Sequence, residues 1–70
     1  MNASAAVARF HACRAAVLPY DFAGLEAPAE LYDALDVAEA ALDAVVPASP
    51  EDVEALAGAY AVLRADGWDV

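Results

Sequence analysis

The stretch Pro28–Val46, PAELYDALDVAEAALDAVV, decides the fold because it has the pattern of one amphipathic helix with two opposed faces. Helical spacing brings its large apolar residues and one Ala to one face: Leu31, Leu35, Ala38, Leu42, Val45 and Val46. The opposite face carries Tyr32, Asp36, Glu39 and Asp43, with Asp33 at its edge. An apolar helix face must be buried against another element, so this stretch predicts packing against further helices.

The residues before this stretch predict a helix over 3–18, which Asn2 or Ser4 can cap and Pro19 ends. One side forms an apolar stripe of Ala6, Phe10, Cys13 and Val17, widened by Val7 and Leu18. The other side is almost pure Ala: Ala5, Ala8, Ala12, Ala15 and Ala16. This Ala face is either plain exposed helix or a seam through which two copies form a homodimer. Arg9 and Arg14 flank the stripe and are expected to form intramolecular ion pairs.

The residues after this stretch predict a helix over 50–66, with Ser49 as its N-cap, Pro50 in its first position and Asp52 completing a shortened capping box. Its predicted apolar side carries Val53, Leu56, Ala57, Tyr60 and Leu63. Gly58 lies mid-helix, where it allows a neighbour to come close. Gly67 suits the position after the C-cap, from which Trp68 would fold back on Leu63. Because only Pro47 and Ala48 separate them, the second and third helices are expected to be antiparallel neighbours.

Residues 19–27 form the longest segment without helical periodicity, and Tyr20, Phe22 and Leu25 are large and apolar for a loop. They either cap one end of the core, the preferred interpretation, or form an exposed binding loop with aromatic anchors. The sequence therefore predicts a single helical domain over residues 1–70: an all-α three-helix bundle with helices at about 3–18, 28–46 and 50–66 and an aromatic loop between the first two.

Charge excludes several classes of partner. The formal net charge is −9, from twelve acidic residues against three Arg, and there is no Lys. Direct nucleic-acid binding needs clustered cations, and docking on an anionic membrane surface needs them too. Such a charge favours a basic protein surface as the partner. The alternative is that the acidity only supports solubility. The N-terminal residues lack the pattern of a secretory signal, which favours a cytoplasmic location.

The sequence contains no pattern typical of catalysis. Ser4 and Ser49 are explained as helix caps, the lone Cys13 lies on an apolar stripe, and His11 is the only His. The three Gly residues are isolated rather than grouped in a phosphate-binding loop, and the acids lack the spacing of a calcium-binding EF-hand. We therefore expect a protein that is not an enzyme and that needs neither cofactor nor metal.

The remaining candidate for a functional site is the surface of the helix at Pro28–Val46. Its acids are neighbours at i,i+3 and i,i+4, where like charges repel, and no Lys or Arg of that helix offsets them. The first hypothesis is a small acidic module that occupies the basic, nucleic-acid-binding surface of a larger protein and inhibits it, with carboxylates in place of phosphates. The residues expected to bind the partner are Tyr32, Asp33, Asp36, Glu39 and Asp43, together with Tyr20 and Phe22.

In size, acidity and helical class the chain resembles small phage-encoded inhibitors of host defence, such as anti-CRISPR proteins. The resemblance is one of general character and implies action in the cytoplasm of the host cell. Two alternatives stay open. One is an antitoxin or intracellular adaptor that docks by apolar contacts through Tyr20, Phe22 or Trp68, and the other is a structural protein that self-associates through the Ala face.

Overall fold

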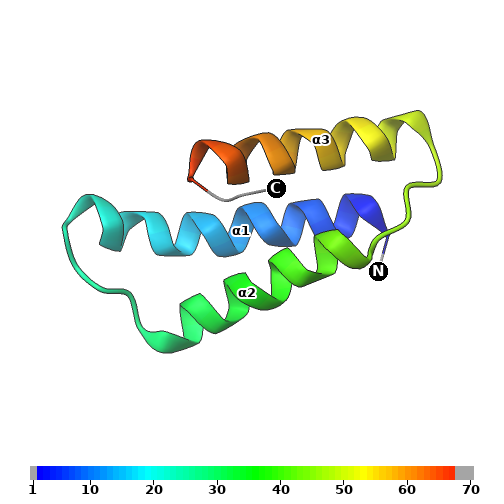
Figure 1. The fold of residues 1–70 in the computed structure, drawn as a ribbon. Helices are drawn as coiled ribbons and strands as arrows, with labels where there is room; N and C mark the ends of the chain where they lie inside the picture. Colours follow the sequence, from blue (N-terminus) through cyan, green and yellow to red (C-terminus); the bar gives the residue numbers. More distant parts are fainter. Residues whose placement is uncertain (1, 68–70) are drawn as a thin grey trace.

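The computed structural model of the protein describes residues 2–67 and contains three helices, α1 at Ala3–Phe22, α2 at Ala29–Ala44 and α3 at Pro50–Ala65 (Figure 1). No strand occurs within this range. The prediction of an all-α protein with three packed helices is confirmed. The third helix begins where the sequence predicts, and the second is shorter by one residue at its start and two at its end.

The central helix is α1, not the stretch that dominates the sequence. Both α2 and α3 pack mainly on α1, which lies between them in Figure 1. The second and third helices run antiparallel as expected (Figure 1), but the main packing partner of each is α1. The short connection does keep them near one another, but where they meet they share a polar contact from Tyr60 to Asp43. The apolar stripes of α2 and α3 are directed at the longer α1 instead.

The first helix continues through Pro19 to Phe22, so the predicted end at residue 18 is also wrong. A proline inside a helix removes one backbone donor, which leaves the carbonyl of Ala15 without its usual partner. Ala15 is exposed, so water can satisfy this carbonyl. Downstream, the Ala23 amide donates to the Pro19 carbonyl at 3.2 Å and keeps the last turn closed.

Gly24 is what ends α1. It adopts φ +70°, the Gly24 amide donates to the Asp21 carbonyl (3.1 Å), and the Leu25 amide donates to the Tyr20 carbonyl (2.8 Å). These two bonds define a Schellman ending. The turn points Phe22 and Leu25 outward, at 85% and 63% exposed. The preferred interpretation, that this segment caps the core, is therefore wrong for Phe22 and Leu25. We call these two exposed residues the apolar tip.

The core lies where the three helices meet, and half of its fully buried apolar residues are Ala. The buried set is Ala3, Ala6, Phe10, Val17, Ala27, Ala38, Leu42, Leu56, Ala59 and Leu63. Phe10 and Leu42 are the largest side chains that are completely buried. Small residues at the contacts let helix backbones approach closely, and Phe10 fills the space that remains between them. The predicted stripe of α1 is confirmed, with Ala3 added to it.

The buried face of α3 is rotated from the predicted one. Leu56, Ala59 and Leu63 are buried, whereas Val53 and Ala57 are exposed. Helical spacing fits either set, and the position of α1 selects between them. On α2 the apolar face is confirmed at Ala38 and Leu42, but Val46 lies beyond the helix and is exposed.

Side-chain caps begin two of the helices. Asn2 rather than Ser4 caps α1, since its side-chain oxygen accepts from the Ala5 amide at 2.8 Å. Ser49 accepts from the Asp52 amide at 3.2 Å, and the Asp52 carboxylate accepts from the Ala48 amide at 2.9 Å. Gly67 has φ +96° and donates to the Arg64 carbonyl, as a glycine after the C-cap should. The predicted contacts of Trp68 lie outside the described residues.

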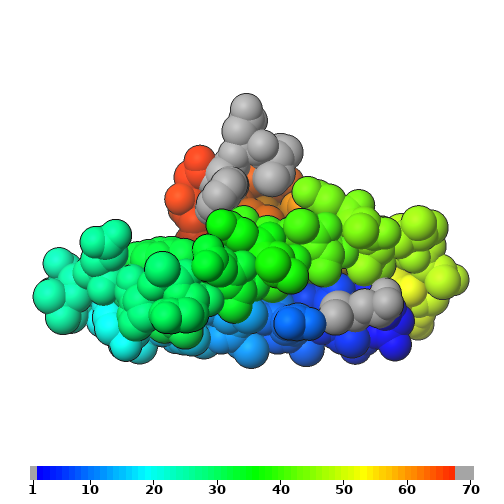
Figure 2. Space-filling model, turned by 90° about the horizontal axis from the view of Figure 1, so that it is seen from below, coloured from blue at the N-terminus to red at the C-terminus, as the bar shows by residue number. Residues whose placement is uncertain are grey.

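The helices assemble into an elongated body of 39 × 21 × 17 Å. In Figure 2, α2 (green) lies across α1 (blue to cyan), and the turn between them forms one end of the molecule. All five residues of the Ala face are exposed. Within residues 2–67, none of the helices combines the length and the apolar character needed to cross a membrane.

Candidate functional site: an acidic face on α2 and its groove

Four of the five carboxylates of α2 follow one another along the helix, and we call them the acidic row: Asp33, Asp36, Glu39 and Asp43. Asp33, Asp36 and Asp43 are exposed and Glu39 is half-buried. Partial burial raises the pKa of Glu39 above its usual value, and the charges of Asp36, Asp43 and Asp66 raise it further. Asp36, Asp43 and Asp66 are therefore close enough to Glu39 to repel its charge, and a cationic partner would relieve this repulsion.

One end of the row is tied to α3. The Tyr60 hydroxyl donates to Asp43 Oδ1 at 2.6 Å, and this bond is the first cause that raises the pKa of Tyr60 to about 12. Burial and the Asp43 charge act in the same direction. One oxygen of Asp43 is thus already committed to an internal bond. The part of the row that is free to accept new donors is thus centred on Asp36 rather than Asp43.

An ion pair lies beside the row, between Arg14 of α1 and Asp66, two residues that are far apart in the chain. Arg14 Nε lies 2.8 Å from Asp66 Oδ2, and Arg14 Nη2 lies 2.9 Å from Asp66 Oδ1, so the pair is bidentate. The bond to Arg14 holds the pKa of Asp66 below its usual value, and the same bond raises the pKa of Arg14. The expected ion pairing is confirmed for Arg14; within residues 2–67 Arg9 forms none.

A groove of about 330 Å³ runs between α1 and α2 at this pair. Its charged lining residues are Arg14, Asp21, Asp36 and Asp66, and of these carboxylates Asp66 pairs with Arg14. Its apolar lining consists of Val17, Leu18 and Leu35, with Tyr32 completing the wall. We call this the α1–α2 groove. An apolar floor beneath a negative rim suits a long cationic side chain, whose methylenes pack while its charged end meets carboxylates.

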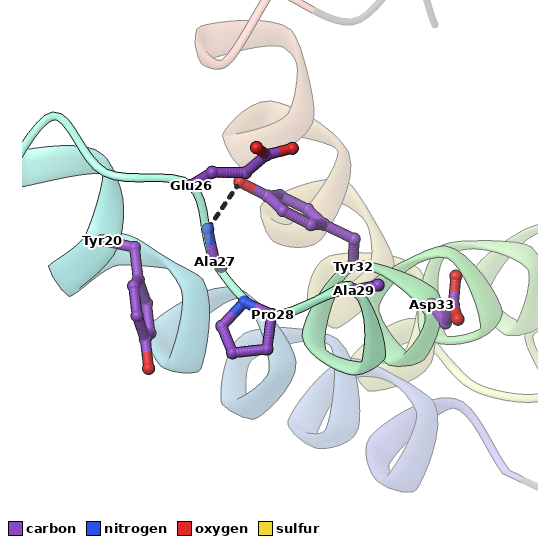
Figure 3. A pocket seen from close by; sticks show the side chains of 7 residues that line it. All are labelled: Tyr20, Glu26, Ala27, Pro28, Ala29, Tyr32 and Asp33. Carbon is purple, nitrogen blue, oxygen red and sulfur yellow. Dashed lines mark hydrogen bonds between the residues drawn. The ribbon is translucent and has the colours of Figure 1, made fainter.

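Tyr32 also lines a second hollow of about 550 Å³ at the turn (Figure 3). That hollow is lined by Tyr20, Glu26, Ala27, Pro28, Ala29, Tyr32 and Asp33. Tyr32 is half-buried, and its hydroxyl oxygen accepts from the Ala27 amide at 3.4 Å. It is therefore neither a core residue nor a free surface anchor. Its ring is a partly fixed wall shared by both hollows.

The structure brings most of the predicted partner-binding residues to this side of the molecule. Tyr20, Tyr32, Asp33 and Asp36 line the two hollows, and Glu39 and Asp43 continue the row along α2. Phe22 lies in neither hollow but on the apolar tip. The acids Asp21, Glu26 and Asp66 were missed, because they lie on or beside other helices and only the packing of the helices brings them next to α2.

Within residues 2–67, no three or more His, Cys, Asp or Glu side chains converge as a metal site would require. Comparisons with protein-family models, with curated proteins and with solved structures found no match to this chain.

Proposed function

We propose that this protein is a small acidic protein-binding module that occupies a basic, nucleic-acid-binding surface of a larger protein and thereby inhibits it. The observation that carries the proposal is the acidic row beside the groove, where burial first and then the charges of Asp36, Asp43 and Asp66 raise the pKa of Glu39. A surface rich in Arg and Lys would relieve this repulsion and gain charge-assisted hydrogen bonds. A nucleic acid that uses the same cations would then be displaced.

The test begins by capturing partners from a lysate of the host cell on the immobilised full chain and eluting them with heparin, a polyanion. The proposal expects captured proteins that also bind nucleic acid and that heparin or DNA releases. It further expects the affinity for a captured partner to fall steeply as salt is raised, because exposed charges are screened. Binding that ignores both salt and polyanion would contradict the proposal.

A charge-matched pair of triple variants locates the contact. The first combines Asp36→Asn, Glu39→Gln and Asp43→Asn in the acidic row. The second combines Glu30→Gln, Glu51→Gln and Glu54→Gln, which removes the same charge from exposed positions outside the row and the groove. Loss of partner binding in the first variant alone supports the proposal, whereas equal losses would show that only net charge matters.

The apolar tip favours one alternative, an antitoxin or adaptor that docks by apolar contacts. Phe22 and Leu25 are held outward by a hydrogen-bonded turn, so presenting them to a partner costs little conformational entropy. Under this alternative, a Phe22→Ser, Leu25→Ser variant would lose the captured partner, while the triple variant of the acidic row would keep it.

A further inference from the structure

We infer that α3 is a hinged arm, which opens away from the α1–α2 pair as a unit and is held closed by two side-chain contacts near its C-terminal end. These contacts are the ion pair between Arg14 and Asp66 and the hydrogen bond from Tyr60 to Asp43. We call the two contacts together the latch. The inference concerns the chain without any partner, so it is independent of the proposed function.

The two connections of the chain differ in how firmly they hold the helices that they join. Between α1 and α2, the turn is closed by the backbone bonds around Gly24, and Ala27 is buried. The Ala27 amide also donates to the Tyr32 hydroxyl at the start of α2. Between α2 and α3, residues 45–49 are non-helical and Val46 is exposed. A few exposed residues of this kind can act as a hinge, so α3 can move without rearranging the other two helices.

The apolar packing of α3 is directed at α1 and is modest in area. Contact between α3 and α2 is sparse. The buried residues of α3 are Leu56, Ala59 and Leu63, which join the cluster around Phe10. Two leucines and one alanine bury little apolar surface, so polar contacts have a larger share in keeping α3 closed. Opening would uncover Phe10, which is completely buried in the closed form.

Charge acts against the approach of α3 to α2. The second helix carries five carboxylates and no Lys or Arg, and the third carries three carboxylates against one Arg and is followed by Asp66. The helix between them, α1, has two Arg against one Asp (Figure 1). Asp66 is one of the charges that raise the pKa of Glu39, after burial, Asp36 and Asp43. The end of α3 is therefore close enough to α2 to be repelled by it.

The latch counters this repulsion at the end of α3 that is far from the hinge. Within residues 2–67, the side-chain bonds that join one helix to another all end on Tyr60 or Asp66. Arg14 donates to Asp66 through bonds of 2.8 and 2.9 Å, and the Tyr60 hydroxyl donates to Asp43 at 2.6 Å. The side-chain bonds at the start of α3 only cap that helix. Breaking the latch should thus release α3 without loosening α1 from α2.

Native-state hydrogen exchange, followed by nuclear magnetic resonance on the isotope-labelled full chain, measures the opening of each helix. In the parent protein we expect the best-protected amides of α3 to exchange several-fold faster than those of α1 and α2, after correction for intrinsic rates. The reason is that α3 opens while the other two helices stay packed. Equal protection in all three helices, or stronger protection in α3, would overturn the inference.

A pair of charge-matched variants on α1 tests the ion pair of the latch. Arg14→Gln should speed the exchange of α3 by roughly two- to five-fold, the range of an exposed ion pair, with less change in α1 and α2. Arg9→Gln makes the same charge change at an exposed position that forms no ion pair within residues 2–67. It should leave the difference between the helices as it is in the parent. Equal effects of the two variants would contradict the latch.

The hydrogen bond of the latch has its own test, which holds even if Arg14→Gln fails to fold. Tyr60→Phe keeps the ring and removes the donor, so it should speed the exchange of α3, whereas Tyr20→Phe should not. Adding Glu39→Gln to Arg14→Gln should slow the exchange of α3 again, because it removes a charge that repels Asp66. Exchange of α3 that Tyr60→Phe leaves unchanged, or that Glu39→Gln does not slow, would count against the inference.

Discussion

At the scale of single residues, two phenylalanines twelve positions apart on α1 have opposite environments. Phe10 is completely buried at the meeting point of the three helices, and Phe22 is 85% exposed at the tip. Deleting a buried aromatic ring removes its transfer free energy and leaves a cavity, whereas deleting an exposed ring does neither. The same substitution therefore separates structural from surface roles.

We predict that Phe10→Ala destabilises the protein by about 3–5 kcal/mol. A core this small rarely supplies more than that in total, so most of the helical circular dichroism should be lost. Phe22→Ala should change the free energy of unfolding by less than about 0.5 kcal/mol. Urea unfolding followed by circular dichroism measures both. Equal losses in the two variants would show that the tip is packed in solution.

The bond from Tyr60 to Asp43 gives a prediction in alkaline solution. The folded-state pKa of Tyr60 is about 12, above its ordinary value of 10.0. The folded chain then holds its proton more tightly than the unfolded chain, so this bond contributes stability below pH 10 that is lost as the pH rises toward 12. Absorbance titration of phenolate in the native protein, compared with Tyr60→Phe, isolates this group. Asp43→Asn should bring the Tyr60 pKa back toward its ordinary value, and an unchanged pKa would contradict the contact.

At the scale of elements, the effect of a proline or glycine on a helix depends on the residues around it. Pro19 is a normal helix terminator, yet α1 passes through it and ends at Gly24 instead. The turn at Gly24 supplies two backbone bonds that a helix ending at residue 18 would lack. Gly58 was expected to admit a close neighbour, but a Cβ atom there would meet nothing within 4 Å. Within residues 2–67, its absence of a side chain serves no packing purpose.

Gly24 and Gly58 therefore predict opposite effects of one substitution. Gly24→Ala should destabilise the protein by about 1–2 kcal/mol, because an L-residue at φ +70° is strained even where space is open. Gly58→Ala should stabilise it by up to about 1 kcal/mol through helix propensity. Thermal unfolding of the two variants beside the parent measures the signs. Destabilisation by Gly58→Ala would indicate that another chain packs against that position.

At the scale of the whole molecule, charge opposes folding. Twelve acidic residues face three Arg, and within residues 2–67 only Arg14 forms an ion pair. Mutual repulsion destabilises the compact state, most visibly at Glu39, whose pKa is raised by burial and then by its acidic neighbours. We therefore expect the free energy of unfolding of this protein to depend strongly on salt concentration and on pH.

We predict that added salt stabilises the protein at neutral pH, because screening weakens the repulsion. Mild acidification should also stabilise it: the folded-state pKa of Glu39 is raised, so the folded chain binds this proton first and its penalty disappears as the pH falls through that value. Further acidification should reverse the trend, since Asp66 has a lowered pKa and loses its bond to Arg14.

Thermal unfolding across a pH series measures this optimum. Glu39→Gln should raise the midpoint at neutral pH and flatten the rise on the mildly acidic side. A parent protein that loses stability monotonically as the pH falls from neutral would show that repulsion at Glu39 is not felt in the fold.

The sequence by itself determined the helical class, the approximate bounds of α2 and α3 and most of the caps. These features depend on spacing, propensity and turn chemistry within a few residues of one another. It also indicated the acidic row, because Asp33 to Asp43 share one helix face. What only the tertiary structure decided is the central place of α1, the buried face of α3, the outward tip and the α1–α2 groove.

The physical reason is that these features depend on contacts between residues far apart in the chain. So much of the sequence is Ala that several helix faces are nearly equivalent as packing surfaces, and periodicity cannot rank them. Burial of Ala6, Ala38 and Ala59 at the contacts selects one arrangement of close-packed helices. Only that arrangement brings Arg14 and Asp66 together and Asp21 and Asp36 to one groove, so the groove exists only once the three helices have packed.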